Sequence, residues 1–431
     1  MLMAPVSSRP RFYHAAHLDA LTARAGLSAR ERLRTRAAAT VLPFHVNDYV
    51  IDELIDWDSA PDDPIYRLVF PLPELLPAEY TELLVRLLRR NASTDEIHSA
   101  AKAILHKLDP YPIGRPDSNI PMLNGERLHG IAHRYPETVL FCPSQGRKNS
   151  ARDIDRLTTY LRAHPAVTDV LLTGGDPMAL SADSLSRCVI PLLTAPGLGH
   201  IESIRIATRS LAHWPARFLS APDTGELLRL FDRIVDSGRN LAILARFTHP
   251  RELRTDLAAQ AVRQLLGTGA SIRTQGPIVH SVNDSPEIWA EMWRTQTRMG
   301  MVPYYAFVER ETGPREYFEV PLVRAHQIFT TAYRAVSGLC RTVRGPVMST
   351  GPGKVVLDGI PRIHGHRYLS LRLLQCRDPD LVNLPFLAQY DQAARWLDDL
   401  RPALGTAHQP PWPLLLGTQI SPPRNNPAAS W

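Results

Sequence analysis

Residues 168–176, TDVLLTGGD, pass from a short apolar run into two glycines and an aspartate. Apolar runs of this length that end in turn residues predict buried β-strands. Similar runs recur along the chain, at 139–141, 202–208, 241–248, 271–278 and 302–309. Amphipathic segments separate them, including SARDIDRLTTYLRAH at 150–164 and GELLRLFDRIVDS at 225–237. Strands that alternate with helices predict βαβ units and a parallel sheet, so the predicted fold class is α/β.

Polar side chains follow nearly every predicted strand. They are Arg147, Thr173 to Asp176, Thr208, Arg209, Thr248, His249, Glu309 and Arg310, with Gln275 inside its own strand. Six βα units fit an open sheet or a barrel, but polar residues at strand ends favour a barrel, where such loops build the active site. We therefore expect a partial, TIM-like (β/α)6 barrel over residues 116–365. Residues 1–115 are expected to be helical, with a capping box at Ser28 and Glu31, and 366–431 to form a Pro-rich irregular arm.

The composition excludes several classes of protein. Hydrophobic residues make up 44% and charged residues 21%, which is ordinary for a globular chain. The net charge is +6, but Lys and Arg are spread along the chain, so no nucleic-acid partner is expected. No apolar run reaches the length of a membrane span and no secretory leader is visible, so we expect a cytoplasmic protein without a membrane partner.

Two short motifs each permit two interpretations. Gly174-Gly175-Asp176 could let a ligand approach closely and accept hydrogen bonds from an ammonium, or it could be a tight βα turn near a helix start. Lys354 ends the segment STGPGK at 349–354. It is either a lysine that forms a Schiff base with pyridoxal phosphate (PLP) or a surface lysine of a hairpin.

Segments quoted in chain order carry a family resemblance over about residues 44 to 360. They are NDYVIDELIDWDSAPDDPIYRLVFP (47–71), HRYPETVL (133–140), HPAVTDVLLTGGDPMALSADSL (164–185), IESIRIATRS (201–210), RFTHPREL (246–253), RTQGPIVHSVND (273–284), VPYYAFVERETGPREYFEVP (302–321) and STGPGK (349–354). Together they resemble the lysine 2,3-aminomutase family of radical S-adenosylmethionine (SAM), PLP-dependent enzymes. The resemblance implies the six-unit partial barrel of that family and an assembly as homodimers or higher oligomers.

The resemblance also implies a PLP site. Lys354 resembles the lysine that forms the Schiff base, and Arg134 resembles a ligand of the PLP phosphate. Gln275 lies in a segment that lines the PLP site. Thr138 stands where the family has a second arginine, which implies a rearranged phosphate site.

The remaining implied roles concern SAM and the substrate. Gly174, Gly175 and Asp176 resemble the turn that holds the methionine ammonium of SAM, and Thr208 and Arg209 resemble its contacts from the next strand. Arg147 resembles the arginine that pairs with the substrate α-carboxylate, a task that suits a bidentate guanidinium. Arg310 replaces an aspartate that faces the side chain of lysine, which suggests an acidic amino acid as substrate.

The loop after the first strand departs from the family. The family holds a [4Fe–4S] cluster there with CxxxCxxC, whereas only Cys142 remains in this chain and Gly146 and Asn149 occupy the other positions. The other cysteines, at 188, 340 and 376, lie far away in sequence. We therefore expect neither this cluster nor another metal site, and no reductive cleavage of SAM.

Taken together, these features predict a PLP-dependent enzyme, an isomerase or lyase, that acts on an amino acid. The reaction would be isomerisation, elimination or polar chemistry linked to SAM, with SAM as ligand or substrate. Two alternatives stay open. One is a radical SAM 2,3-aminomutase for an acidic amino acid with a non-standard cluster. The other is a non-catalytic, ligand-binding pseudoenzyme.

Overall fold

A large mixed sheet forms the centre of the computed structural model, which describes residues 10–108, 119–143, 150–309, 315–403, 405, 407 and 409–415. Twelve strands pair within these residues, in the order β14-β15-β13-β12-β11-β10-β9-β8-β7-β6-β5, with β16 added beside β15. The strands from β6 to β12 run parallel to one another. The α/β prediction is confirmed.

The six predicted strands are all present as six βα units. The parallel strands are β6 (Thr138–Phe141), β7 (Asp169–Leu172), β8 (Ser203–Thr208), β9 (Asn240–Arg246), β10 (Ser271–Ile278), β11 (Val302–Val308) and β12 (Arg344–Ser349). The helices between them are α6 (Ser150–Arg162), α7 (Ala182–Thr194), α8 (Ser210–His213), α9 (Thr224–Asp236), α10 (Asp256–Gly267), α11 (Pro286–Arg298), α12 (Arg315–Phe318) and α13 (Leu322–Arg334). The seventh parallel strand, β12, was not predicted. Gly345 and Pro346 interrupt the apolar run that would have indicated it.

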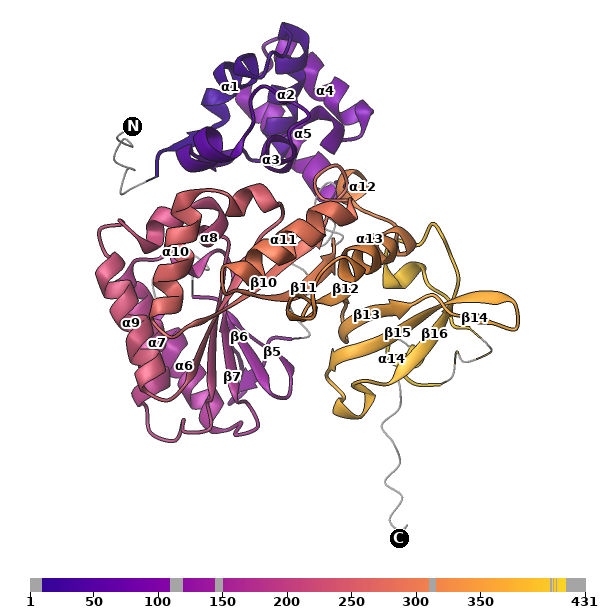
Figure 1. Ribbon diagram of the computed structural model, residues 1–431. Helices are drawn as coiled ribbons and strands as arrows, with labels where there is room; N and C mark the ends of the chain where they lie inside the picture. The colour runs from indigo at the N-terminus through magenta and orange to yellow at the C-terminus, as the bar shows by residue number, and fades with distance from the viewer. Residues whose placement is uncertain are drawn as a thin grey trace.

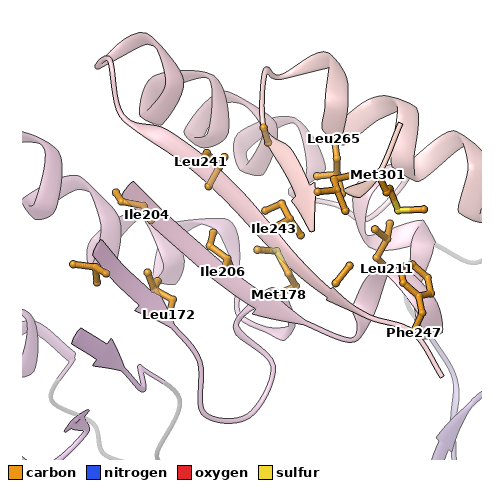
Figure 2. Packing of buried hydrophobic residues seen from close by; sticks show 14 of the residues in the cluster. Leu172, Met178, Ile204, Ile206, Leu211, Leu241, Ile243, Phe247, Leu265 and Met301 are labelled. Atoms are coloured by element: carbon orange, nitrogen blue, oxygen red, sulfur yellow. The ribbon is translucent and has the colours of Figure 1, made fainter. Parts of the chain in front are cut away.

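The main core lies between the outer face of the sheet and the helices. Figure 2 shows Leu172, Ile204, Ile206 and Ile243 projecting from neighbouring strands into this layer. Successive side chains of a strand point to opposite faces. In β8 the buried Ile204 and Ile206 therefore alternate with Arg205 and Ala207, which line a cavity on the inner face.

The described part of the N-terminal region is mainly helical. Its elements are β1 (Phe12–His14), α1 (Leu18–Arg24), α2 (Ala29–Val41), β2 (His45–Asn47), α3 (Pro64–Val69), α4 (Ala78–Arg89) and α5 (Thr94–Leu108), and Figure 1 shows these helices grouped beside the barrel helices. The capping box of Ser28 and Glu31 is present at the start of α2. Short strands β3 (Met122–Leu123), β4 (Glu126–Arg127) and β5 (Ile131–Tyr135) follow. The buried Asp63 pairs with Arg251 after β9, so the region is tied to the barrel.

The irregular arm predicted from residue 366 begins later than expected. Residues His366–Cys376 form β15, which pairs with β13 (Gly353–Gly359) and β16 (Pro385–Gln389), while β14 (Arg362–Ile363) lies at the edge. Leu369, Leu371 and Leu373 are fully buried at every second position. This period of two is typical of a strand, and it outweighs the high proline content nearby. After β16 the described residues run through turns to α14 (Trp412–Leu415).

One-turn elements complete the description: η1 (Ala15–His17), η2 (Val50–Leu54), η3 (Pro73–Leu75), η4 (Pro177–Ala179), η5 (Pro215–Phe218), η6 (Pro250–Leu253), η7 (Gly338–Cys340), η8 (Pro379–Leu381) and η9 (Leu397–Asp399). Among the described residues, no helix has both the length and the apolar character that crossing a bilayer requires.

We predict that Gly276→Ala destabilises the fold by about 1–3 kcal/mol, the usual range for overpacking. A Cβ at Gly276 in β10 would lie 2.1 Å from the carbonyl oxygen of Phe247, and this backbone group cannot swing away. Urea unfolding measures the change. Gly267→Ala is the matched control, because a Cβ there meets open space at the end of α10. Equal urea midpoints for Gly276→Ala and wild type would contradict the close approach.

Candidate functional site

A cavity of about 210 Å³ occupies the lumen of the partial barrel. Every strand from β5 to β13, and also β15, contributes to its wall, which shows that the sheet curls round on itself. A second cavity of about 270 Å³ shares Gln275, Phe307 and Ser349 with the first and adds Arg246 and Glu309. The predicted PLP residues Arg134, Gln275 and Lys354 are brought together in the first cavity.

Lys354 extends from the start of β13 into the lumen. Its Nζ donates a hydrogen bond of 2.7 Å to Oε1 of Gln375 and lies 4.8 Å from the ring centroid of Tyr305. Burial lowers the pKa of Lys354 to about 7, and the positive charges of Arg205, Arg344 and Arg134 act in the same direction. The lysine does belong to a hairpin, but its amine faces the cavity, and the lowered pKa increases its neutral fraction near neutral pH.

The glycine before Lys354 is required by a close approach of two strands. A Cβ at Gly353 would lie 2.1 Å from the carbonyl oxygen of Gln375 in β15. The Gly-Pro-Gly turn therefore has a packing function: it lets β13 lie tightly against β15 and so fixes where the lysine leaves the backbone.

Two arginines add positive charge to the cavity wall. Arg134 in β5 has an Nη2 that lies 3.5 Å from the carbonyl oxygen of Gly353. Arg205 in β8 pairs with Asp169, with 2.8 Å between Nε and Oδ1, and Thr138 donates to the same carboxylate at 3.0 Å. Thr138, which stands where the family has an arginine, thus helps to orient Arg205. The lumen as a whole suits an anionic group such as a phosphate.

The Gly174-Gly175-Asp176 turn is built as a tight turn. Both glycines have positive φ, 80° and 70°. The Asp176 carboxylate accepts hydrogen bonds from the backbone N–H groups of Met178 and Arg209 and from the hydroxyl of Thr208, at 2.7–2.9 Å. It also accepts from the N–H and hydroxyl of Ser210, at 3.0 and 2.9 Å. Protein donors therefore use most of its acceptor capacity, and SAM binding at this turn stays a prediction.

A buried charged cluster lies beyond β8 and β9, and the sequence reasoning missed it. Oε1 of the fully buried Glu252 lies 3.0 Å from Nε2 of His213 and 3.9 Å from Nη2 of Arg209. Burial acts to raise the pKa of Glu252, but His213, Arg209 and the N–H of Thr248 outweigh it, so the pKa is lowered. A signal existed: Glu252 closes a capping box that begins at His249.

Two predicted substrate residues, Arg147 and Arg310, lie outside the described residues. So do Gly146 and Asn149, which stand where the resemblance places two cluster cysteines. Cys142 is half-buried beside the glycine turn, since a Cβ on Gly174 would lie 2.6 Å from its Sγ. Burial raises the pKa of the Cys142 thiol. Within the part of the chain that the structure describes, no three Cys, His, Asp or Glu side chains gather as metal ligands.

The fold and the lumen define an α/β partial barrel with a cavity inside it. No family model matches the chain. A putative L-lysine 2,3-aminomutase of Aquifex aeolicus (strain VF5) is 28% identical over 386 residues, which are 86% of this chain and 90% of that protein. The L-lysine 2,3-aminomutase of Escherichia coli (strain K12) is 24% identical over 344 residues, 79% and 91% of the two chains. That of Clostridium subterminale is 27% identical over 229 residues, 49% of this chain and only 52% of that protein. Over most of its length the chain is therefore similar to curated proteins that are named L-lysine 2,3-aminomutase.

We predict that Lys354 reacts with acetic anhydride half-maximally near pH 7 in the folded protein. Only the neutral amine reacts, and the neutral fraction rises as the pH rises through a pKa of about 7. The chain has four lysines, at 102, 107, 148 and 354, so mass spectrometry can follow each one. In urea the midpoint for Lys354 should move to the ordinary value near 10.5. Equal midpoints in the folded and unfolded protein would contradict the burial of this amine.

Proposed function

We propose that this chain is a PLP-dependent enzyme that acts on an amino acid without the iron–sulfur cluster of its family. One observation carries the proposal: an amine with a pKa of about 7, that of Lys354, faces a lumen lined by two arginines. The names of the curated relatives support an aminomutase, which is an isomerase. The proposal also includes two other reactions that the same site could catalyse: elimination and polar chemistry on SAM.

The residues of the lumen fit PLP. Lys354 would hold the cofactor through its amine, because a neutral amine attacks an aldehyde whereas an ammonium does not. Arg134 and Arg205 would bind the phosphate, and the ring of Tyr305 and the amide of Gln275 would face the cofactor. When bound, PLP supplies an electron sink for negative charge that develops at Cα of an amino acid.

The chain's own groups would then handle the proton at Cα. Once the substrate amino group has taken its place on the cofactor, the released Nζ of Lys354 could accept that proton, because the pKa of about 7 of the free amine suits a general base that operates near neutrality. The rings of Tyr135 and Tyr305, with centroids 5.8 and 4.8 Å from Nζ, limit the access of water. We assign the substrate carboxylate to Arg147 and the distal end of the substrate to Arg310, as the resemblance implies.

The described residues do not fit a [4Fe–4S] cluster. Cys142 is a free cysteine after β6, and no set of three potential metal ligands gathers in the described ranges. The proposed chemistry therefore uses no iron–sulfur cluster. We propose Gly174, Gly175, Asp176, Thr208 and Arg209 as the place where SAM would bind, as ligand or as substrate. The proposal also includes a homodimer or higher oligomer.

Borohydride reduction of the protein with PLP should attach a phosphopyridoxyl group to Lys354 and to none of the other lysines, as peptide mapping will show. The reason is that Lys354 alone combines the lumen position with a depressed pKa among the three described lysines. Lys354→Arg keeps the positive charge but should abolish labelling. An unlabelled Lys354 in folded wild-type protein would overturn the PLP assignment and leave the non-catalytic binding protein as the better interpretation.

We predict that Arg134→Met raises the PLP concentration needed for half-maximal labelling at least tenfold. A charge-assisted bond to a phosphate contributes about 1.5–3 kcal/mol, which corresponds to roughly a tenfold change or more. Absorbance titration with PLP measures the affinity. Arg156→Met, which removes an exposed arginine paired with Glu126, is the matched control and should leave the affinity unchanged. Unchanged affinity in Arg134→Met would remove this arginine from the phosphate site.

A radical SAM 2,3-aminomutase is the second candidate. The names of the relatives and the position of Cys142 against Gly174 favour it. Anaerobic reconstitution, followed by iron and sulfide analysis and a test for reductive cleavage of SAM, separates the two candidates. Four irons per chain with cleavage of SAM would support the radical enzyme. Turnover of an amino acid by iron-free protein would support the cluster-independent enzyme.

A further inference from the structure

A polar relay crosses the seam where the two ends of the curled sheet meet. Nζ of Lys354 donates to Oε1 of Gln375 at 2.7 Å, and Nε2 of Gln375 donates to Oε1 of Glu137 at 3.0 Å. Lys354 and Gln375 are directly opposed in the pairing of β13 with β15. Glu137 lies in the turn between β5 and β6. The relay therefore connects β13 and β15 to the turn between β5 and β6 through side chains.

The chemistry of the groups fixes the direction of the relay. A carboxylate only accepts hydrogen bonds, whereas an amide has a donor end and an acceptor end. Glu137 therefore requires the NH₂ of Gln375 on its side, and this leaves the amide oxygen to face Lys354. The lysine amine can donate to that oxygen in both its neutral and its protonated form.

Each member of the relay is attached to rigid backbone. The carbonyl oxygen of Glu137 accepts hydrogen bonds of 3.1 Å from the N–H groups of Thr168 and Asp169, at the start of β7. At the other end, the close contact between Gly353 and the carbonyl oxygen of Gln375 sets the spacing of β13 and β15. The amide oxygen is thus presented to the amine from a fixed place.

We infer that Gln375, oriented by Glu137, is a positioning residue that holds the amine of Lys354 in the lumen and sets how readily it becomes protonated. The inference rests on the proposed function, in which Lys354 is the reactive lysine. It goes further, because it assigns a role to two residues, one of them exposed, that lie outside the implied cofactor set.

The surroundings of the Lys354 amine contain groups that oppose its charged form and groups that favour it. Arg205, Arg344 and Arg134 disfavour a further positive charge, and Asp169 favours one. The ring centroids of Tyr135 and Tyr305 lie 5.8 and 4.8 Å from the amine, and the π faces of such rings attract a cation. The oxygen of Gln375 is the direct acceptor, so its loss should leave the ammonium less stable and the side chain free to turn away.

The test measures the pH profile of Lys354 acetylation in full-length protein without PLP. Gln375→Leu removes the acceptor, so the pKa should fall; a shift of one unit would make labelling at pH 6 about fivefold faster. Gln375→Glu has the same shape and adds a negative charge, so the pKa should rise and labelling at pH 7 should become about fivefold slower for one unit. Glu137→Gln should shift the profile in the direction of Gln375→Leu, by less.

Gln389→Leu is the control. Gln389 lies in β16 and donates to the carbonyl oxygen of Pro402, so its loss should leave the profile of Lys354 unchanged. Circular dichroism and urea unfolding identify variants that do not fold; the isosteric Gln375→Glu keeps the test decisive if Gln375→Leu fails. Profiles of folded Gln375→Glu and Gln375→Leu that coincide with wild type would overturn the inference. Because PLP is absent, this outcome is independent of borohydride trapping, which tests the proposed function itself.

Discussion

Helical cover on only one face of the sheet is the constraint on which the rest of the structure depends. Parallel strands joined by right-handed crossovers place their helices on the outer face, where Ile204, Ile206 and Ile243 are buried. No helices cover the inner face of the described sheet. Its side chains are therefore shielded from water only because the sheet curls into a partial barrel. The antiparallel strands β13 and β15 extend this curl until Gln375 reaches Glu137 at the far edge. Side-chain hydrogen bonds connect the two edges where they meet. Unlike backbone hydrogen bonds between strands, they involve the amine of Lys354 and the carboxylate of Glu137.

The electrostatics of the lumen follow from that closure. Arg134, Arg205 and Lys354 share a space from which water is partly excluded, with Asp169 as the nearby carboxylate. Guanidinium groups keep their protons under all ordinary conditions, whereas an amine can release one. Loss of a proton from Lys354 therefore relieves the repulsion between these positive charges. The arginines thus add to the effect of burial in lowering the pKa of Lys354. An anionic ligand would counteract the same repulsion.

Much of the fold could be predicted from periodicity, because six apolar runs and the helices between them repeat one pattern. The strand β15 was predictable in principle, since Leu369, Leu371 and Leu373 alternate clearly, but the prolines after it suggested an arm. The motif STGPGK was enough to select Lys354 as a candidate. Its contacts with Gln375 and Tyr305 could not be predicted from that motif. The partnership of Gln375 with Glu137 joins residues 238 positions apart and exists only because the sheet curls. No local pattern encodes such a contact.

Two carboxylates link three consecutive loops at the carboxyl ends of the strands. Asp176, after β7, is bonded to the backbone of Arg209 and Ser210 after β8. Glu252, after β9, reaches back to His213 in α8. The loop after β8 is thus bonded to the loops on both sides of it. Moving it away from either one would break a hydrogen bond to a carboxylate. Any ligand that binds over β7, β8 and β9 therefore meets a surface whose shape these bonds set before it arrives.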